Sequence, residues 1–199
     1  MNNNVSTAST NRKFGTRQLT MIGMLSAISI VLGATGYGFI PLPMAKATIL
    51  HIPVIIGAVL EGPIVGAMIG LLFGVFSLIQ NYVAPSSALF FAFQNPLVSV
   101  LPRILIGIVA YYTYKYMFSK KEIIKVGAAA LIGTLTNTVG VLVMVNLLYA
   151  DHAAKVLKVT TATVSKVIYG IALTNGIPEA IVAVIITVPV VMTLKKIRK

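Results

Sequence analysis

The segment from Gly38 to Gly74 is apolar enough to enter a lipid bilayer, yet four prolines interrupt it: Pro41, Pro43, Pro53 and Pro63. Each proline removes a backbone hydrogen-bond donor and disfavours helix at the residue before it. Inside hydrocarbon, backbone that is not helical is tolerated only where protein buries it or where it lines a cavity. Broken apolar elements of this kind are typical of binding sites in membrane transporters. The segment therefore predicts a cavity for a small molecule within a membrane protein.

The amino-acid composition indicates the same class of protein. Hydrophobic residues make up 57% of the 199 residues and charged residues only 10%, which is typical of a polytopic membrane protein. The absence of cysteine excludes disulfides, thiolate metal sites and cysteine nucleophiles. The formal net charge of +12 would suit a nucleic-acid ligand, but the basic residues flank apolar runs and form no face shared with aromatic residues. We therefore expect a lipid bilayer and no nucleic acid as a partner.

Hydropathy predicts an all-α fold with six membrane-spanning helices, at about 18–37, 49–60, 63–81, 95–115, 126–149 and 168–194. With about 1.5 Å of rise per residue, the second helix reaches only roughly 18 Å and must be sheltered, tilted or joined to the breaks beside it. Residues 1–16 are polar and precede an apolar run without a cleavage site. They predict a disordered cytoplasmic tail, and residues 17–199 then form one six-helix membrane domain.

Lysine and arginine set the predicted orientation, because they are enriched in cytoplasmic segments. With six spans, three basic groups share one side of the membrane: Arg12, Lys13 and Arg17; Lys115, Lys120, Lys121 and Lys125; Lys195, Lys196, Arg198 and Lys199. The other side carries Lys46, Lys155, Lys158 and Lys166. Both termini are therefore expected in the cytoplasm. The hydrophobic loop at 38–48, the aromatic loop at 81–94 and the amphipathic loop at 150–167 then lie outside and could cap a pocket.

Two charged residues, Arg103 and Glu179, fall well inside predicted spans. An intramembrane charge is costly and faces a partner or a cavity. Arg103 and Glu179 either contact a ligand or neutralise one another as a structural pair, and the two interpretations are compatible. Asn175 stands four residues before Glu179 and therefore shares its helix face. Asn95 and Ser99 lead into Arg103 at the same four-residue spacing. Asn95 and Asn175 are candidate ligand contacts, although polar residues in membranes also serve helix packing.

His51 and Lys46 lie beside the proline-broken segment. His51 either contacts a ligand or finds its partners at the membrane interface, and no metal site is expected because His152 is the only other histidine. Lys46 either extends to the lipid headgroups or binds an anionic ligand beneath a lid formed by the first outer loop.

The first predicted span carries a surface of small residues, Gly23-x-x-x-Ala27, that suits close helix contact. This surface serves either packing within the chain or docking onto another membrane subunit. No Walker lysine motif and no HExxH motif are present, and the chain has only four acidic residues. We expect neither ATP binding by the chain itself nor an enzyme, and we assign no catalytic residue and no cofactor.

Two long segments, PLPMAKATILHIPVIIGAVLEGPIVGAMIGLLFGVFSLI and NPLVSVLPRILIGIVAYYTY, resemble the substrate-binding S component of energy-coupling factor (ECF) vitamin transporters, as does NGIPEAIVA in the last span. The resemblance covers nearly the whole chain. It implies a six-helix bundle in the bacterial cell membrane that binds a vitamin from outside, with the first loop as a lid. It also implies association with a membrane T component and two cytosolic ATPase subunits.

In that family an Ala-x-x-x-Ala motif on the first helix faces the T component, and the matching residues here are Gly23 and Ala27. The chain most resembles S components for pantothenate, followed by those for hydroxymethylpyrimidine or pyridoxine. Arg103 and Lys46 would suit a carboxylate such as that of pantothenate. If Glu179 occupies Arg103, a neutral ring becomes the better ligand. A different class remains open, namely a membrane assembly protein whose polar residues only join helices.

Overall fold

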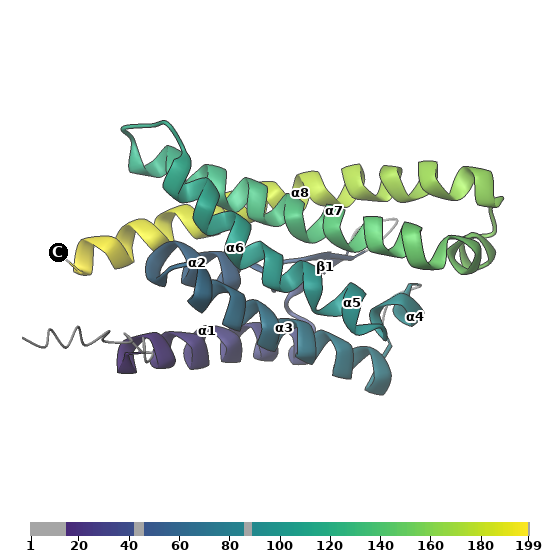
Figure 1. Ribbon diagram of the computed structural model, residues 1–199, viewed down its shortest axis with the longest axis horizontal. Coiled ribbons are helices and arrows are strands. Elements are labelled where there is room, and N and C mark those ends of the chain that lie inside the picture. Colours follow the sequence, from purple (N-terminus) through teal and green to yellow (C-terminus); the bar gives the residue numbers. More distant parts are fainter. Residues whose placement is uncertain (1–14, 42–45, 86–88, 199) are drawn as a thin grey trace, which may run out of the picture.

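Helices form almost all of the computed structural model, which describes residues 15–41, 46–85 and 89–198 (Figure 1). Among these residues, five helical segments are long and apolar enough to cross a membrane, and one further apolar helix is short. The predicted all-α membrane class is therefore confirmed. The elements are α1 (Thr16–Thr35), β1 (Phe39–Pro41), β2 (Lys46–Thr48), α2 (Ile52–Glu61), α3 (Pro63–Val83), α4 (Phe90–Phe93), α5 (Pro96–Ser99), α6 (Leu101–Tyr116), α7 (Glu122–Leu157) and α8 (Thr161–Ile197).

The prolines of the interrupted apolar segment mark where its elements begin. Pro53 and Pro63 lie in the first turns of α2 and α3, where the missing amide would have had no partner within the helix. Gly62 joins the two helices with a φ of 104°, a conformation that favours glycine. Pro41 lies in β1, and Pro43 is outside the described residues. The segment is thus folded as a hairpin followed by two helices.

The short helix α2 is the most buried element of the bundle. Every residue from Ile52 to Val59 is buried, and α2 contacts α1, α3, α6, α7 and α8. The surrounding helices therefore remove its sides from lipid. A helix of ten residues is too short to cross a bilayer by itself, and the surrounding helices shelter it, as one of the predicted alternatives had it.

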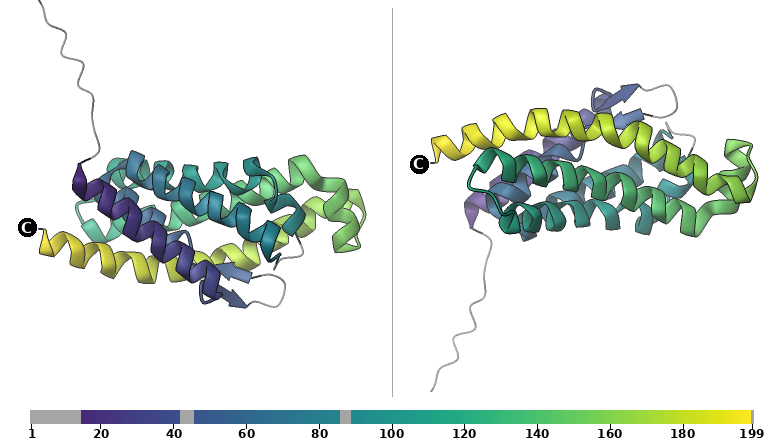
Figure 2. Two further views of the ribbon diagram at one scale, coloured as in Figure 1. Left: turned by 90° about the horizontal axis from the view of Figure 1, so that it is seen from below. Right: turned by 90° about the horizontal axis from the view of Figure 1, so that it is seen from above.

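The first predicted loop, 38–48, contains a small antiparallel hairpin. Phe39 in β1 lies opposite Thr48 in β2, and Pro41 lies opposite Lys46. The hairpin follows the end of α1 and contacts α8, beside which it lies in Figure 2. It leads directly into the buried start of α2.

The beginning of α1, the connection from α6 to α7 and the end of α8 lie at one end of the molecule (Figure 1). Glu61 forms ion pairs there with Arg17, at 3.0 Å, and with Arg198. Lys195 forms an ion pair with Glu122. The three basic groups of the sequence, as far as they are described, therefore share one end. The predicted tail, 1–16, falls mainly on residues 1–14, which are outside the described part.

The last two long helices extend further than predicted. α7 continues to Leu157 across a break in helical geometry at Tyr149, where φ is −135° and ψ is 21°. α8 begins at Thr161 and continues through Pro178 and Pro189. The predicted loop at 150–167 is therefore largely helical. The amphipathic pattern of this segment reflects helical extensions of α7 and α8 with one buried face, which carries Ala153, Ala154 and Val164.

Candidate functional site

Arg103 lies in the first turn of α6, immediately after Pro102. Its backbone packs against Gly70 of α3, where a side-chain carbon would collide with the Arg103 carbonyl oxygen. This close approach explains the glycine at position 70. It also fixes the start of α6 against α3, so that the Arg103 side chain projects from a rigid part of the bundle.

The guanidinium of Arg103 is held in a buried aromatic environment. It lies 5.7 Å from the ring centre of Phe73 and 5.3 Å from that of Phe93, distances at which a cation is attracted to a ring face. Nη1 donates a hydrogen bond of 2.7 Å to the carbonyl of Val98. The residue is 5% exposed, and its buried Nε has no hydrogen-bond partner. Arg103 thus retains donor capacity within the protein interior.

Glu179 of α8 is also 5% exposed, but both of its carboxylate oxygens have partners. Oε1 accepts a hydrogen bond of 2.6 Å from the backbone N–H of Thr48 in β2. Oε2 accepts one of 2.8 Å from the hydroxyl of Thr138 in α7. Glu179 therefore connects the hairpin to two long helices.

The predicted ion pair between Arg103 and Glu179 is not formed. The ion pairs of the described residues are those of Glu61 and Glu122, and Arg103 belongs to none of them. The two charges are still close enough to interact electrostatically. Glu179 therefore forms no direct ion pair with Arg103, and no described carboxylate lies within ion-pair distance of the guanidinium.

Close contacts between helices bring Arg103 and Glu179 into the same part of the bundle. A methyl group at Gly140 of α7 would lie 3.1 Å from Pro102, the neighbour of Arg103. One at Gly176 of α8 would lie 3.6 Å from Thr138. The start of α6, the middle of α7 and the middle of α8 therefore meet where Arg103 and Glu179 lie.

Two buried asparagines contribute to the same region. Asn137 is 3% exposed and precedes Thr138, and Asn175 is 7% exposed and lies one turn before Glu179. The Oδ1 atom of each has no donor. With Nε of Arg103, the helices α6, α7 and α8 thus each contribute an unpaired buried polar atom to this region. Buried polar groups normally have partners, so this arrangement is typical of a site that a ligand or ordered water completes.

The structure describes the side chain of His51 but not that of Lys46. His51 is fully buried, and its Nε2 lies 2.9 Å from Oγ1 of Thr134. The histidine is therefore in the protein interior, with a protein partner. Lys46 lies in β2, but its side chain is outside the described part of the structure.

The spacing predicted that Asn95 and Arg103 share one helix face, but no continuous helix joins them. A break at Val100 separates α5 from α6. Oδ1 of Asn95 caps α5 by accepting from the Leu97 amide at 2.9 Å, and Nδ2 donates to the Tyr149 hydroxyl at 3.1 Å. These contacts join α5 to the kink in α7, so they give Asn95 a structural role.

Gly23 and Ala27 of α1 face outward. Gly23 and Ala27 are exposed, and no atom lies within 4 Å of the position of a side chain at Gly23. The opposite face of α1 carries its buried residues: Met21, Ile22, Leu25, Ser26, Ser29 and Gly33. The small surface therefore does not serve packing within this chain.

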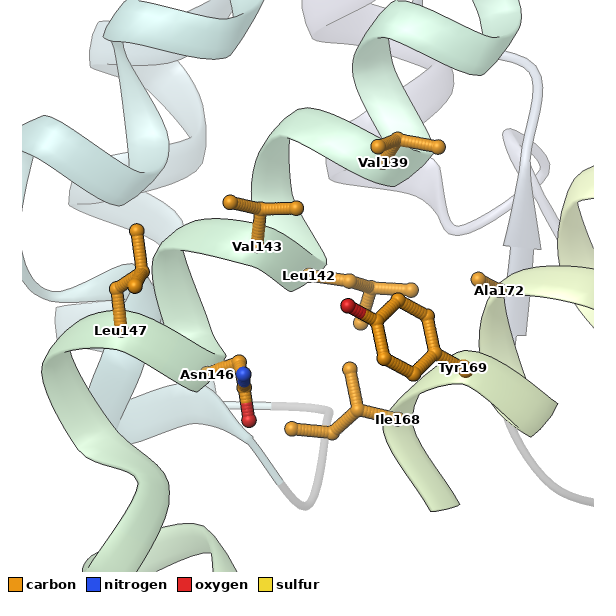
Figure 3. Close-up of a pocket in the computed structure, with 8 residues that line it drawn as sticks. All are labelled: Val139, Leu142, Val143, Asn146, Leu147, Ile168, Tyr169 and Ala172. Carbon is orange, nitrogen blue, oxygen red and sulfur yellow. The ribbon is translucent and has the colours of Figure 1, made fainter. Parts of the chain in front are cut away.

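A separate pocket of about 150 Å³ lies between α7 and α8, on the outer surface of the helix pair (Figure 3). Leu147 and Tyr169 at this pocket are exposed, and its walls are apolar apart from Asn146 and the Tyr169 hydroxyl. The lining residues are Val139, Leu142, Val143, Asn146, Leu147, Ile168, Tyr169 and Ala172. None of the predicted ligand contacts lines it, so it is distinct from the buried polar region.

Sequence reasoning missed several residues of the buried region. Phe73 and Phe93 were not predicted beside Arg103. Aromatic residues are common in membrane spans, so their presence in the sequence did not mark them as part of a site. Thr138 was visible as part of a polar face with Thr134 and Asn137. Within the described ranges, no group of three or more histidine, cysteine, aspartate and glutamate side chains could hold a metal ion.

The fold and the buried polar region define an integral membrane protein with a site enclosed between helices. The family model for the substrate-specific component of ECF transporters matches residues 17–191, and the chain belongs to this family. It is a multi-pass protein of the cell membrane and a transporter component, not an enzyme.

Two curated proteins are similar over much of their length. The pantothenic acid transporter PanT of Lactococcus lactis is 36% identical over 171 residues, which cover 79% of this chain and 82% of that protein. The pantothenate transporter PanT of Leuconostoc mesenteroides is 33% identical over 115 residues, which cover 54% of this chain and 56% of that protein.

Proposed function

We propose that this S component binds pantothenate in the buried region around Arg103. The observation that carries the proposal is the Arg103 guanidinium, which is buried between two aromatic rings, has no carboxylate partner and keeps a free Nε. A buried cation of this kind is stabilised by an anionic ligand. Arginine binds carboxylates through paired hydrogen bonds, and pantothenate has one carboxylate. The names of the two similar proteins support the same vitamin.

The rest of the ligand would meet the amides of Asn137 and Asn175. Pantothenate has hydroxyl groups and an amide, which can donate to the unpaired Oδ1 atoms of these residues. His51 and Lys46 are further candidate contacts. The hairpin of β1 and β2 would form the lid over this site, and the ligand would enter from the outer face of the membrane.

The proposed topology has six membrane helices, with α2 as the second, and both termini in the cytoplasm. The grouping of basic residues at one end of the molecule supports this orientation. The exposed Gly23 and Ala27 of α1 would dock onto a membrane T component. Two cytosolic ATPase subunits bound to that component would supply the energy for uptake.

Equilibrium binding to the purified protein tests the ligand. We expect pantothenate to bind in isothermal titration calorimetry, and Arg103→Ala to weaken binding at least about a hundredfold, because a buried charged contact is lost. Arg103→Lys keeps the charge but not the paired geometry and should retain part of the affinity. Lys120→Ala, in the exposed connection between α6 and α7, is the control and should bind as the wild type does.

Two results would contradict the proposal. One is wild-type protein that binds a neutral vitamin such as pyridoxine or hydroxymethylpyrimidine and not pantothenate. The other is Arg103→Ala protein that is folded and binds pantothenate within twofold of the wild type. Failure to bind any water-soluble vitamin would instead favour a membrane assembly role.

A further inference from the structure

The carboxylate of Glu179 lies where the hairpin meets the helix bundle. We propose that Glu179 is a positioning residue, which anchors β2 to α7 and α8 and so holds the hairpin over the buried site. In this assignment Glu179 itself does not contact the ligand. The part of the inference that concerns the ligand rests on the proposed function, whereas the anchor concerns the protein alone.

The hydrogen bonds of Glu179 carry the inference. Its two oxygens accept from the Thr48 amide at 2.6 Å and from the Thr138 hydroxyl at 2.8 Å, so each oxygen is directed to a protein donor. Hydrogen bonds to an ionised carboxylate are about twice as strong as those between neutral groups. These two bonds direct the carboxylate toward the hairpin and α7, whereas Oδ1 of Asn175, one turn earlier, accepts from no protein donor.

Besides the packing of Phe39 in β1 against the hydrophobic core, few described contacts hold the hairpin in position. It consists of two strands of three residues each, and an isolated two-stranded hairpin is marginally stable. Its other described backbone bonds reach the end of α1 and the turn after β2: Gly38 N–H donates to the Leu32 carbonyl at 2.8 Å, and Ile49 N–H donates to the Gly38 carbonyl at 3.0 Å. These bonds tie the hairpin to its own neighbours in sequence. The Glu179 bond ties it to the opposite side of the bundle.

The anchored residue is also connected to the start of α2. The Leu50 amide donates to the Thr48 hydroxyl at 3.2 Å, and the Leu50 carbonyl accepts from the Ser29 hydroxyl of α1 at 3.0 Å. Fixing Thr48 therefore fixes the point where the chain turns from the hairpin into the bundle. Loss of the Glu179 bond should loosen the hairpin first and leave the bundle intact.

Hydrogen exchange of the ligand-free protein in detergent tests the anchor without any ligand. Glu179→Gln keeps the shape of the side chain but weakens both hydrogen bonds, and should speed exchange at Thr48 and its hairpin neighbours roughly three- to tenfold. Glu179→Ala should speed it more. Amides of α3 should be unchanged in both. Thr136→Ala is the control, because that hydroxyl donates only within its own helix, to Ile132, and hairpin exchange should match the wild type.

A second measurement uses the rate at which labelled pantothenate dissociates. A loosened hairpin should raise the dissociation and association rates together, so that Glu179→Gln changes the rates several-fold more than the equilibrium affinity. The inference is overturned if Glu179→Gln leaves hairpin exchange unchanged, or if exchange rises equally throughout the protein. It is also overturned if affinity falls while hairpin exchange is unchanged, since Glu179 would then contact the ligand. Failure of wild-type protein to bind pantothenate would refute the proposed function and leave the exchange test of the anchor valid.

Discussion

Nε2 of His51 lies 2.9 Å from Oγ1 of Thr134, and this contact joins the residue before α2 to the middle of α7. The hydroxyl proton of Thr134 is donated to the carbonyl of Ala130 at 2.8 Å. The tautomer of His51 sets which of the two atoms donates in this contact. A buried histidine thus holds the start of the short central helix in the core.

Replacing Thr134 by valine should destabilise the protein, because the buried Nε2 of His51 would lose its hydrogen-bond partner. We expect the free energy of unfolding to fall by about 1–3 kcal/mol, seen as a lower melting temperature in detergent. Thr134→Ser keeps the hydroxyl and should melt close to the wild type. Equal melting temperatures for the serine and valine variants would show that the hydrogen bond contributes little.

The contact between α3 and α6 depends on glycine at position 107. A side-chain carbon there would collide with the backbone of Gly66. Gly107→Ala should therefore separate the helices and lower the free energy of unfolding by about 1–3 kcal/mol. Gly170→Ala is the matched control, because no atom lies within 4 Å of the corresponding position in α8. A Gly107→Ala protein that melts with the control would contradict the packing described above.

Glu61 forms ion pairs with two arginines at the end of the molecule where α1 begins and α8 ends. The side chain of Glu61 is 8% exposed, whereas that of Arg17 is 61% exposed. Arg17→Ala should therefore cost less than about 1 kcal/mol, and that small effect should vanish at high salt. Glu61→Ala leaves two arginines without a partner and should cost more. Thermal unfolding of both variants at low and high salt measures these costs. Equal melting temperatures for Arg17→Ala and Glu61→Ala would contradict the larger cost expected for the loss of Glu61.

Leucine at Gly23 or Ala27 should block the exposed small surface of α1 without disturbing the core. We expect both variants to bind the vitamin as the wild type does and to lose uptake in cells, because close helix contact needs small side chains. Met24→Leu, an exposed neighbour on α1, is a matched control and should retain uptake. Full uptake by both leucine variants would place the docking surface elsewhere.

Much of the protein could be predicted from particular sequence features. The apolar runs located the long helices, and Pro53 and Pro63 marked helix boundaries within a few residues. The charges Arg103 and Glu179 stood out because few such residues occur inside the spans. The spacing of Asn175 and Glu179 placed both on one buried face of α8. These predictions succeed because helix periodicity and the cost of charge in lipid act locally along the chain.

The partners of those residues were decided only by the tertiary structure. Glu179 meets Thr48, 131 residues earlier in the chain, and Arg103 lies between Phe73 and Phe93 without meeting Glu179. The face of a helix can be read from its own sequence. What that face meets depends on how the helices are rotated and packed, which close contacts such as that of Gly70 with Arg103 determine. The sequence thus determined which side chains would be buried and polar, and packing decided which of them bind each other and which remain free for a ligand.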